Sequence, residues 1–425
     1  MEYPKIEIRN FGPIKEACFD LKKYNVIIGE QASGKSYISK LIYFFRSLPS
    51  ELLKVVVYYI NYERPQNKTN FENYNEHRYL NQRLIKESVN YYNLIFKQVS
   101  FNEIGEIKYT TQYGEIVLNK KGIEIQVLSK IIEDILNNLE IQGIKEDNSL
   151  SKYLNVSAVS SIFRKYFPEN NDSFYVPAGR MYNRKITKSN VMLINKDPLE
   201  LKFADFYNNL DIGYYDTTET DENGNVFEFL IDKALENKKN NINLLTKNII
   251  KGKYIYQNHK EFIDLGNEKI IPLKDGSTGQ KETARLTEIL KFIIMYNLKE
   301  FMYIEEPEAH IYPIAQYNLT KLLALFVNND SNNQLLITTH SPYILGALNN
   351  LLYAFKMSQF NNEEINKIIP KEFWINPNEI GAYKIKEGVL VDIFDTESGL
   401  ICNEEIDEVS ALLNDEYAEM SNYYE

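Results

Sequence analysis

The chain has 425 residues, 44% of them hydrophobic, which is enough for a large core divided into two or three subdomains. Its two cysteines, Cys18 and Cys402, lie far apart in sequence, so neither a disulfide framework nor a cysteine-rich metal site is expected. No apolar stretch approaches the roughly 18 residues of a membrane span, and the N-terminus lacks a signal-peptide pattern. We therefore expect a cytoplasmic protein without a membrane partner.

The acidic charge is concentrated at the C-terminus. The net charge is −11, but residues 387–425 contain 12 acidic side chains and no Lys or Arg. The rest of the chain then has 47 acidic and 48 basic side chains and is close to neutral. The overall charge therefore neither supports nor excludes binding to nucleic acid.

The first part of the chain is predicted to begin with strands and continue with helices. Residues 1–30 predict two or three short strands with a turn at Gly12-Pro13. A helix is expected next, ending at about Leu48-Pro49, and residues 51–98 also have a helical pattern. The further expected elements are three strands in 104–128 with turns at Tyr113-Gly114 and Lys121-Gly122, a helix in 129–141 and a buried strand ending in a loop in 172–180.

The segment 185–260 is polar and mostly helical by pattern, and we interpret it as an inserted helical arm or lid. Its heptads are too short and too broken for a long coiled coil. Near the C-terminus, residues 374–401 predict a short β meander, followed by an acidic amphipathic helix around 406–413. The acidic side chains of this tail suit a solvated face or a surface that docks a partner.

A glycine-rich turn, "GEQASGKS" from Gly29 to Ser36, fits the pattern G-x-x-x-x-G-K-[ST] at every fixed position. It follows a short β-branched run and precedes a helical pattern, so its backbone N–H groups and the helix dipole would face a phosphate chain. Lys35 can reach the β- and γ-phosphates, and the Ser36 hydroxyl can ligate Mg²⁺. The alternative is an ordinary glycine-containing loop. The candidate nucleotide-binding residues of this Walker A motif are Gly29, Gln31, Ser33, Gly34, Lys35 and Ser36.

A second motif, "FMYIEEPEAHIYP" from Phe301 to Pro313, has the pattern of a Walker B strand. An apolar run delivers Glu305 and Glu306 at its end, where the first acid would lie near Mg²⁺ and the second would orient or deprotonate the attacking water. Adjacent strand residues point to opposite faces, so the strand must end here, and Pro307 supports that ending. A solvated acidic turn is the alternative. His310 fits either a chemical role or a helix-start or interface position.

Two further motifs lie around the Walker B segment. "NQLLITTHSPYIL" (333–345) predicts a buried strand that ends at His340, where an imidazole could sense a γ-phosphate. Ser277, Gly279 and Gln280 form a Ser-x-Gly-Gln turn before an amphipathic helix, which is a second anion-binding shape. Such a turn is also a common helix cap.

The order of these motifs resembles the ABC-type ATPases of the SMC, RecF and OLD group. "EEPEAHIYP" looks like the Walker B segment of stand-alone AAA ATPases of the OLD type, and "IEIRNFGPI" looks like their first strands. The resemblance covers the chain to about residue 350. It implies two heads that dimerise around ATP, with Lys35 and Ser36 from one protomer and Ser277, Gly279 and Gln280 from the other. It also implies Glu306 as general base, Glu305 as an acid beside Mg²⁺, and His340 as switch histidine.

The expected fold is α/β, an ABC/SMC-type P-loop ATPase head with a mixed β-sheet core and an inserted helical arm or lid. The segment "YVPAGR" (175–180) is a candidate for the Q-loop region, where Arg180 would either approach phosphate or lie at the surface. We divide the chain into an N-terminal ATPase lobe with Walker A (1–50), its helical and β-hairpin insertion (51–170), a strand plus helical arm (171–264), a C-terminal ATPase lobe (265–350) and an acidic β/α extension (351–425).

Full OLD proteins resemble this head followed by a Toprim nuclease, for which the 85 residues after His340 are too few. We therefore expect an ATP- and Mg²⁺-dependent regulatory ATPase that forms a homodimer or higher homo-oligomer. By analogy with PARIS- or Septu-like systems, it would serve prokaryotic anti-phage defence with a separate nuclease or toxin as effector. The alternative is an SMC- or RecF-like DNA repair or maintenance ATPase, for which Lys238, Lys239, Lys247, Lys251 and Lys253 could supply a basic surface. A transporter subunit is a third, less well matched class.

Overall fold

The structure is a computed structural model, and it describes residues 3–64, 75–141, 149–167, 172–180, 197–209, 233–257, 260–402 and 414–421. The chain divides into two compact units. Unit 1 comprises residues 1–22, 32–173 and 385–391, and unit 2 comprises 23–31, 174–384 and 392–425. We describe each unit by itself.

Unit 1 is built on a sheet with the strand order β6-β5-β4-β1-β2-β14. The neighbours from β6 to β2 are antiparallel, whereas β14 pairs with β2 in parallel, so the sheet is mixed. The three strands and two turns predicted in 104–128 are confirmed. The strands are β1 (Lys5–Phe11), β2 (Ile14–Asp20), β4 (Glu106–Thr111), β5 (Gly114–Asn119), β6 (Gly122–Ile125) and β14 (Val389–Asp392).

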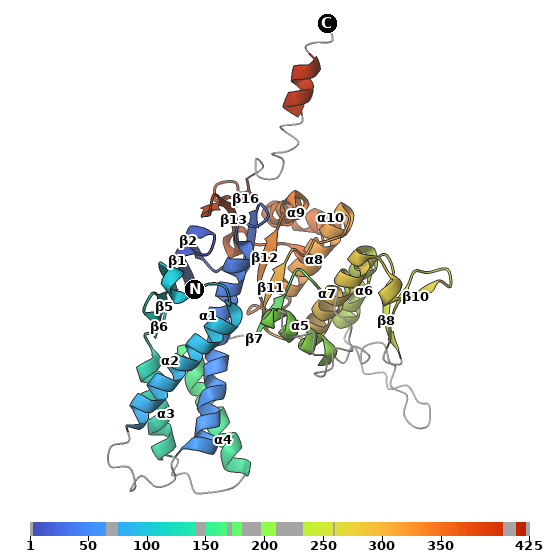
Figure 1. Cartoon of the computed structure of the whole chain (residues 1–425). Helices are drawn as coiled ribbons and strands as arrows, with labels where there is room; N and C mark the ends of the chain where they lie inside the picture. The colour runs from blue at the N-terminus through green and yellow to red at the C-terminus, as the bar shows by residue number, and fades with distance from the viewer. Residues whose placement is uncertain are drawn as a thin grey trace, which may run out of the picture. The chain divides into compact units, whose positions relative to one another are not determined.

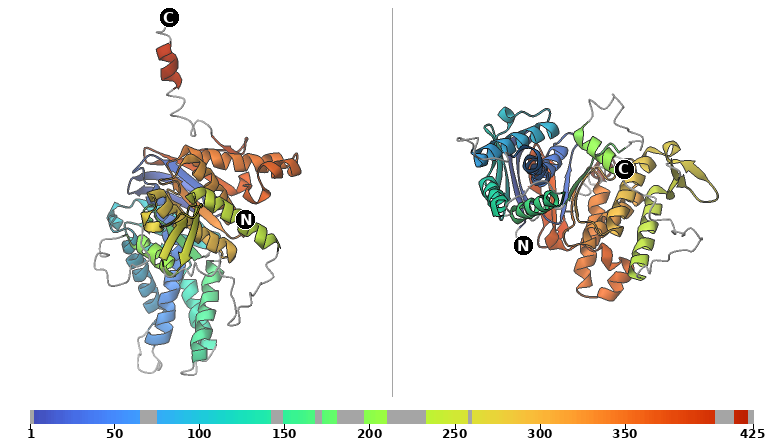
Figure 2. Two further views of the ribbon diagram at one scale, coloured as in Figure 1. Left: turned by 90° about the vertical axis from the view of Figure 1, so that its right-hand side faces the viewer. Right: turned by 90° about the horizontal axis from the view of Figure 1, so that it is seen from below.

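Four helices pack in a ring, α1 against α2, α2 against α3, α3 against α4 and α4 against α1 (Figures 1 and 2). They are α1 (Lys35–Tyr58), continued by a short π-helix (Tyr59–Glu63), α2 (Glu76–Ile95), α3 (Leu128–Ile141) and α4 (Ser149–Tyr166). The expected end of the first helix at Leu48-Pro49 is wrong, because α1 runs through Pro49. A proline inside a helix costs about 3 kcal/mol, but the buried side chains of Leu48, Leu52 and Val56 hold this turn in the core.

Unit 2 has a sheet with the strand order β13-β3-β12-β11-β7. Strands β3, β12 and β11 are parallel, and all six residues of β3 are buried. Continuous β-branched runs are typical of parallel strands that are covered on both faces, so the predicted α/β class is confirmed. The strands are β3 (Tyr24–Gly29), β7 (Asp172–Val176), β11 (Glu300–Glu305), β12 (Gln334–Thr339) and β13 (Ile380–Lys386).

Helices α6, α7 and α8 lie side by side and share the core of unit 2 with α9 (Figure 1). The helices are α5 (Pro198–Asn209), α6 (Lys233–Ile250), α7 (Thr278–Met295), α8 (Pro313–Asn329), α9 (Pro342–Ser358) and α10 (Asn362–Ile368). Short 3-10 turns cover Phe101–Glu103 in unit 1 and Leu273–Asp275, Lys371–Phe373 and Pro377–Glu379 in unit 2.

The segment interpreted as a helical arm is only partly helical where the structure describes it. Helices α5 and α6 agree with the prediction, but Lys253–Gln257 is a strand, β8. It pairs with β9 (Lys260–Asp264), which pairs with β10 (Ile270–Pro272). Tyr254, Ile255 and Tyr256 are residue types that favour strands, a signal that the lysine- and asparagine-rich context concealed. Residues 185–196, 210–232 and 258–259 of the predicted arm lie outside the described residues.

The predicted C-terminal β meander is confirmed by β13, β14 and the hairpin of β15 (Phe394–Asp395) and β16 (Leu400–Ile401). The acidic helix expected at 406–413 lies outside the described residues. Among the residues that the structure places, no helix is both long and apolar enough to cross a lipid bilayer.

Candidate nucleotide-hydrolysis site

Three predicted motifs follow three neighbouring parallel strands of unit 2. Ile28 of β3 is opposite Thr339 of β12, and Thr338 of β12 is opposite Glu305 of β11. The strands therefore end level with one another, and the residues that follow them are brought to one edge of the sheet. Ligands of open α/β sheets bind beyond the carboxyl ends of the strands. This edge carries Gly29, Glu306 and His340.

The Walker A loop begins in unit 2 at Gly29 and continues into unit 1, where α1 starts at Lys35. Gly34 has φ 105° and is the N-cap of α1, so no side chain caps this helix. A Cβ at Gly34 would lie 2.5 Å from the side chain of Ile14, so only glycine fits. The uncapped helix start leaves N–H donors for an anion. Lys35 is 5% exposed, and Ser36 is exposed.

Ser33 adds a polar group to this loop in unit 1. Its Oγ is buried and makes no hydrogen bond within the described part of the chain. Burying a hydroxyl without a partner is unfavourable, and a phosphate oxygen would supply the missing acceptor. Gln31, also a candidate residue, is exposed.

Glu305 is the buried acid of the Walker B pair, with 7% exposure. The hydroxyl of Tyr175, from β7, donates to Glu305 Oε1 at 2.6 Å, and the N–H of Ala178 points at Oε2 at 3.4 Å. Both contacts stabilise the charged carboxylate. The sequence placed Tyr175 in a buried strand but did not indicate that it contacts Glu305.

Arg180 does not lie at the surface, which was one of the two positions that the sequence left open. Its side chain is fully buried, and the guanidinium donates to the backbone carbonyls of Glu305 (2.8 Å), Glu306 (3.0 Å) and Pro177 (3.3 Å). Burial lowers the pKa of Arg180, and the surrounding carboxylates partly oppose that shift. Arg180 therefore fixes the main chain of the Walker B acids. Arg285 of α7, which sequence reasoning missed, donates to the Arg180 carbonyl at 2.7 Å.

Glu306 lies where the strand has ended, as predicted from the two adjacent acids. Its φ is 43°, a left-handed conformation that costs a non-glycine residue about 1–2 kcal/mol. Three hydrogen bonds hold it: its N–H donates to Thr338 O at 2.8 Å, and its carbonyl accepts from Arg180 and, at 3.0 Å, from the Ala309 N–H. The surrounding chain thus maintains a strained backbone at the predicted general base.

The side chains of Glu306 and His340 are in contact. The Glu306 Oε1 to His340 Nε2 distance is 3.1 Å, and the two side chains are 39% and 32% exposed. Both groups can therefore meet water. His340 is fixed from behind, because Glu308 Oε1 accepts its N–H at 2.7 Å and the Thr339 hydroxyl at 2.7 Å. Glu308 is a further residue that the sequence did not single out for a role.

The predicted signature residues form a reciprocal helix cap at the start of α7. Ser277 Oγ accepts the Gln280 N–H at 3.2 Å, and Gln280 Oε1 accepts the Ser277 N–H at 3.0 Å. The Gln280 side-chain amide also donates to the Ile250 carbonyl at 3.0 Å. The alternative interpretation of this turn, a helix cap, is therefore what the single chain forms. Contact of these residues with a second protomer stays a prediction.

Gly279 joins α7 to the Walker B turn. A Cβ at Gly279 would lie 2.3 Å from the carbonyl oxygen of His310. The His310 side chain is 58% exposed, and its Nδ1 lies 3.2 Å from the buried Glu282 carboxylate. His310 thus lies at an intramolecular junction, as one of its two sequence interpretations expected.

Gly279→Ala is expected to lower the free energy of unfolding by about 1–3 kcal/mol, although alanine normally favours a helix. The reason is that the new methyl group must push α7 away from the backbone of the Walker B turn. Chemical denaturation of both proteins measures the change. Gly179→Ala is the matched control, because a Cβ at Gly179 meets no atom of the residues that the structure describes within 4 Å. Equal stabilities for the two variants would show that the close approach is unimportant.

A Mg²⁺ ion would find oxygen donors here, which are the ligands that it prefers. Within unit 2 the buried Glu305 carboxylate is such a donor, and within unit 1 the Ser36 hydroxyl is exposed. In the described parts of the chain, no group of three or more His, Cys, Asp or Glu is placed to hold a metal by itself. The ion would therefore need nucleotide phosphates and water as further ligands.

A phosphate-binding loop, a mixed α/β sheet and paired acids after a parallel strand define a P-loop ATPase. Residues 1–345 match the family model described as the AAA ATPase domain, and the chain belongs to this family. It is therefore an ATPase that binds ATP and hydrolyses it. No curated protein matches the sequence.

Several solved structures are similar to the chain. An Smc head bound to the C-winged helix domain of ScpA has 11% identity and a TM-score of 0.41, over 93% of this chain and 98% of that chain. The SMC head domain from Thermotoga maritima has 10% identity and a TM-score of 0.36, over 92% and 98%. The recombination mediator protein RecF has 14% identity and a TM-score of 0.29, over 92% and 99%. The assignment of the chain as an ATPase depends on the family match over residues 1–345 and on the geometry of the candidate site, and not on these structures.

Proposed function

We propose that the chain hydrolyses ATP at the sheet edge that carries Glu306 and His340. The observation that carries this proposal is their 3.1 Å contact beyond β11 and β12, beside the strand that leads into Walker A. Lys35 holds the β- and γ-phosphates, and the N-terminus of α1 supports them. Glu306 accepts a proton from the attacking water, which its partial exposure admits.

The other residues of the site position this base. Before ATP binds, the His340 imidazole donates a hydrogen bond to Glu306. With ATP bound, it would instead donate to a γ-phosphate oxygen, and this change of partner would signal that the nucleotide is present. The Glu308 carboxylate accepts hydrogen bonds from the His340 N–H and from the Thr339 hydroxyl. The backbone at His340 is therefore held in place, and only the imidazole has to move. Glu305 and Ser36 would hold Mg²⁺, which neutralises charge that develops on the phosphates.

We propose further that ATP joins two heads, with Ser277 of one protomer reaching the γ-phosphate held by the other. Ser277→Asp tests this role separately from helix capping. Aspartate is as good an N-cap as serine, so the free energy of unfolding should change by less than about 0.5 kcal/mol. Its negative charge would repel phosphate, so the turnover number should fall at least about tenfold. Denaturation and phosphate release measure the two quantities.

Ser277→Ala is the complementary variant. It loses the cap, which costs about 1 kcal/mol, but adds no repulsive charge. The proposal expects Ser277→Asp to be the slower ATPase and the more stable protein. Turnover that simply follows stability in the two variants would contradict a phosphate contact and leave Ser277 as a cap.

The biological role that we propose is the ATPase component of a prokaryotic anti-phage defence system, acting in the cytoplasm with a separate nuclease or toxin. The support is the resemblance of the motif order and of "EEPEAHIYP" to OLD-type ATPases. A Glu306→Gln protein, purified from its native host with ATP present and analysed by mass spectrometry, tests this role. A nuclease or toxin encoded nearby should copurify with it. Copurification of DNA alone would contradict the defence role and favour DNA maintenance.

A further inference from the structure

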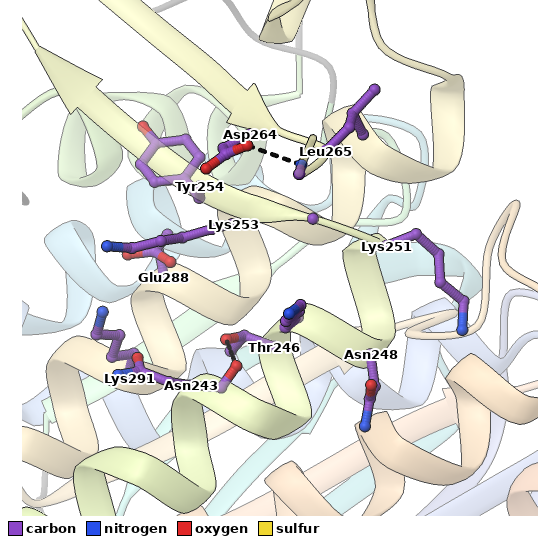
Figure 3. A pocket seen from close by; sticks show the side chains of 13 residues that line it. Asn243, Thr246, Asn248, Lys251, Lys253, Tyr254, Asp264, Leu265, Glu288 and Lys291 are labelled. Atoms are coloured by element: carbon purple, nitrogen blue, oxygen red, sulfur yellow. Dashed lines mark hydrogen bonds between the residues drawn. The ribbon is translucent and has the colours of Figure 1, made fainter. Parts of the chain in front are cut away.

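Unit 2 contains a polar pocket of about 610 Å³. None of the ATPase motifs lines it. Its wall is formed by α6, the turn from α6 to β8, the end of β9, and α7 (Figure 3). Four lysines and two acids line it, so its formal charge is positive. These residues are Lys247, Lys251, Lys253, Lys291, Asp264 and Glu288.

Lys291 is the most informative residue of this pocket. It is only 7% exposed, yet it makes no hydrogen bond or ion pair with any residue that the structure describes. Burial of most of this side chain removes water from around its ammonium, and within the described residues no carboxylate or other acceptor replaces that water. In Figure 3 its side chain lies at the pocket, on the same side as Asn243, Lys253 and Glu288. A bound anion would supply the missing partner.

The neighbouring lysines are held on a rigid turn. Gly252 packs so closely on β9 that a Cβ there would lie 2.7 Å from the Asp264 carbonyl oxygen. Lys251 and Lys253 flank this glycine, and Lys251 has a φ of 54°. The carboxylate of Asp264 accepts the Gly266 N–H at 2.8 Å, so it serves the β9 turn. Within the described residues, the side chains of Lys247 and Lys251 also form no ion pair.

We propose that this pocket binds a small, phosphate-bearing anion of nucleotide size. Its volume falls within the roughly 300–1,000 Å³ of small-molecule sites, which are concave. Lysines bind phosphate as point charges, and the pocket also offers the amides of Asn243 and Asn248 and the hydroxyl of Thr246. This assigns a role to three of the five lysines that the sequence singled out. Lys238, by contrast, donates to Asn329 on α8.

The test is titration calorimetry of the full-length protein with tripolyphosphate, without magnesium. The protein carries Lys35→Ala, which removes phosphate binding by the Walker A loop from the measurement. We expect one tripolyphosphate per chain, and binding at least about tenfold weaker when Lys247→Gln and Lys291→Met are added. The matched control adds Lys260→Gln and Lys269→Gln, which remove two exposed lysines of β9 and of the β9–β10 turn outside the pocket. This control should bind as tightly as the Lys35→Ala protein.

Three results would overturn the proposal: no binding to the Lys35→Ala protein, equal losses in the pocket and control variants, or tight binding only of a 20-base-pair duplex DNA. The last result would make the lysines part of an extended nucleic-acid surface. Lys291→Met removes a charge from a side chain that is largely buried, so it is not expected to unfold the protein. Lys247→Gln alone changes an exposed position and gives a second measurement of the loss of tripolyphosphate binding. The assay needs no hydrolysis, so its outcome is independent of the proposed catalytic roles.

Discussion

Glu306→Gln is expected to lower the turnover number for ATP by about 10²–10⁴-fold, the usual contribution of a general base. Glutamine keeps the size of the side chain and can still accept a hydrogen bond from His340, but it cannot take a proton from water. The left-handed backbone at this position should persist, because its hydrogen bonds come from main-chain groups and Arg180. Steady-state phosphate release measures the loss.

ATP affinity should change little in the same variant, since the role proposed for Glu306 is to act on water and not on the nucleotide. Equilibrium binding of ATP with Mg²⁺ should agree with that of the wild type within about threefold. The control is Glu363→Gln, which removes an exposed acid of α10 and should leave turnover unchanged. A wild-type turnover number for Glu306→Gln would show that another group takes the proton.

Lys35→Ala is expected to weaken ATP binding at least about 100-fold, because it removes a charge-assisted contact to two phosphates. The side chain begins at the first residue of α1 and is 5% exposed, so water cannot simply replace it. Binding of a fluorescent ATP analogue, followed by displacement with ATP, measures the effect. Loss of ATP binding should also abolish ATP-dependent assembly of heads.

The matched control for this variant is Lys54→Ala. Lys54 lies on the same helix, has a side chain that is 70% exposed, and pairs with Glu51 at the surface. Exposed ion pairs contribute about 0–1 kcal/mol, so this variant should bind ATP as the wild type does. Equal affinities for Lys35→Ala and wild type would show that the Walker A loop is not the nucleotide site.

The sequence predicted the parts of the fold whose signals are local. The buried runs of β3, β11 and β12, the turns at Gly114 and Gly122, and the end of β11 at Glu305 all follow from periodicity and turn chemistry. The continuation of α1 through Pro49 was not predictable in this way, because tertiary burial overrides the local preference of proline. The strand at Lys253–Gln257 was not predicted, because the segment around it is rich in lysine and asparagine. Its formation depends on pairing with β9.

The supporting contacts of the candidate site depend on residues that are distant in sequence. Tyr175 and Glu305 are 130 residues apart, and Arg180 reaches a carbonyl 125 residues further along the chain. A single sequence contains no signal for such pairs, so Arg180 was expected at phosphate or at the surface. The roles of Arg285 and Glu308 were missed for the same reason. The Walker motifs could be predicted because their residue types and spacing are set by phosphate chemistry itself.

The central claim is that ATP held at this site joins two heads and that Glu306 then hydrolyses it. The most direct test is the mass of the Glu306→Gln protein in solution, measured by light scattering with Mg²⁺ in the presence and absence of ATP. Without ATP, we expect the mass of the 49.8 kDa chain, or of the assembly that the chain forms in the absence of nucleotide. With ATP, we expect at least twice that mass. The same mass in both conditions, with ATP shown to be bound, would contradict ATP-driven pairing of the heads.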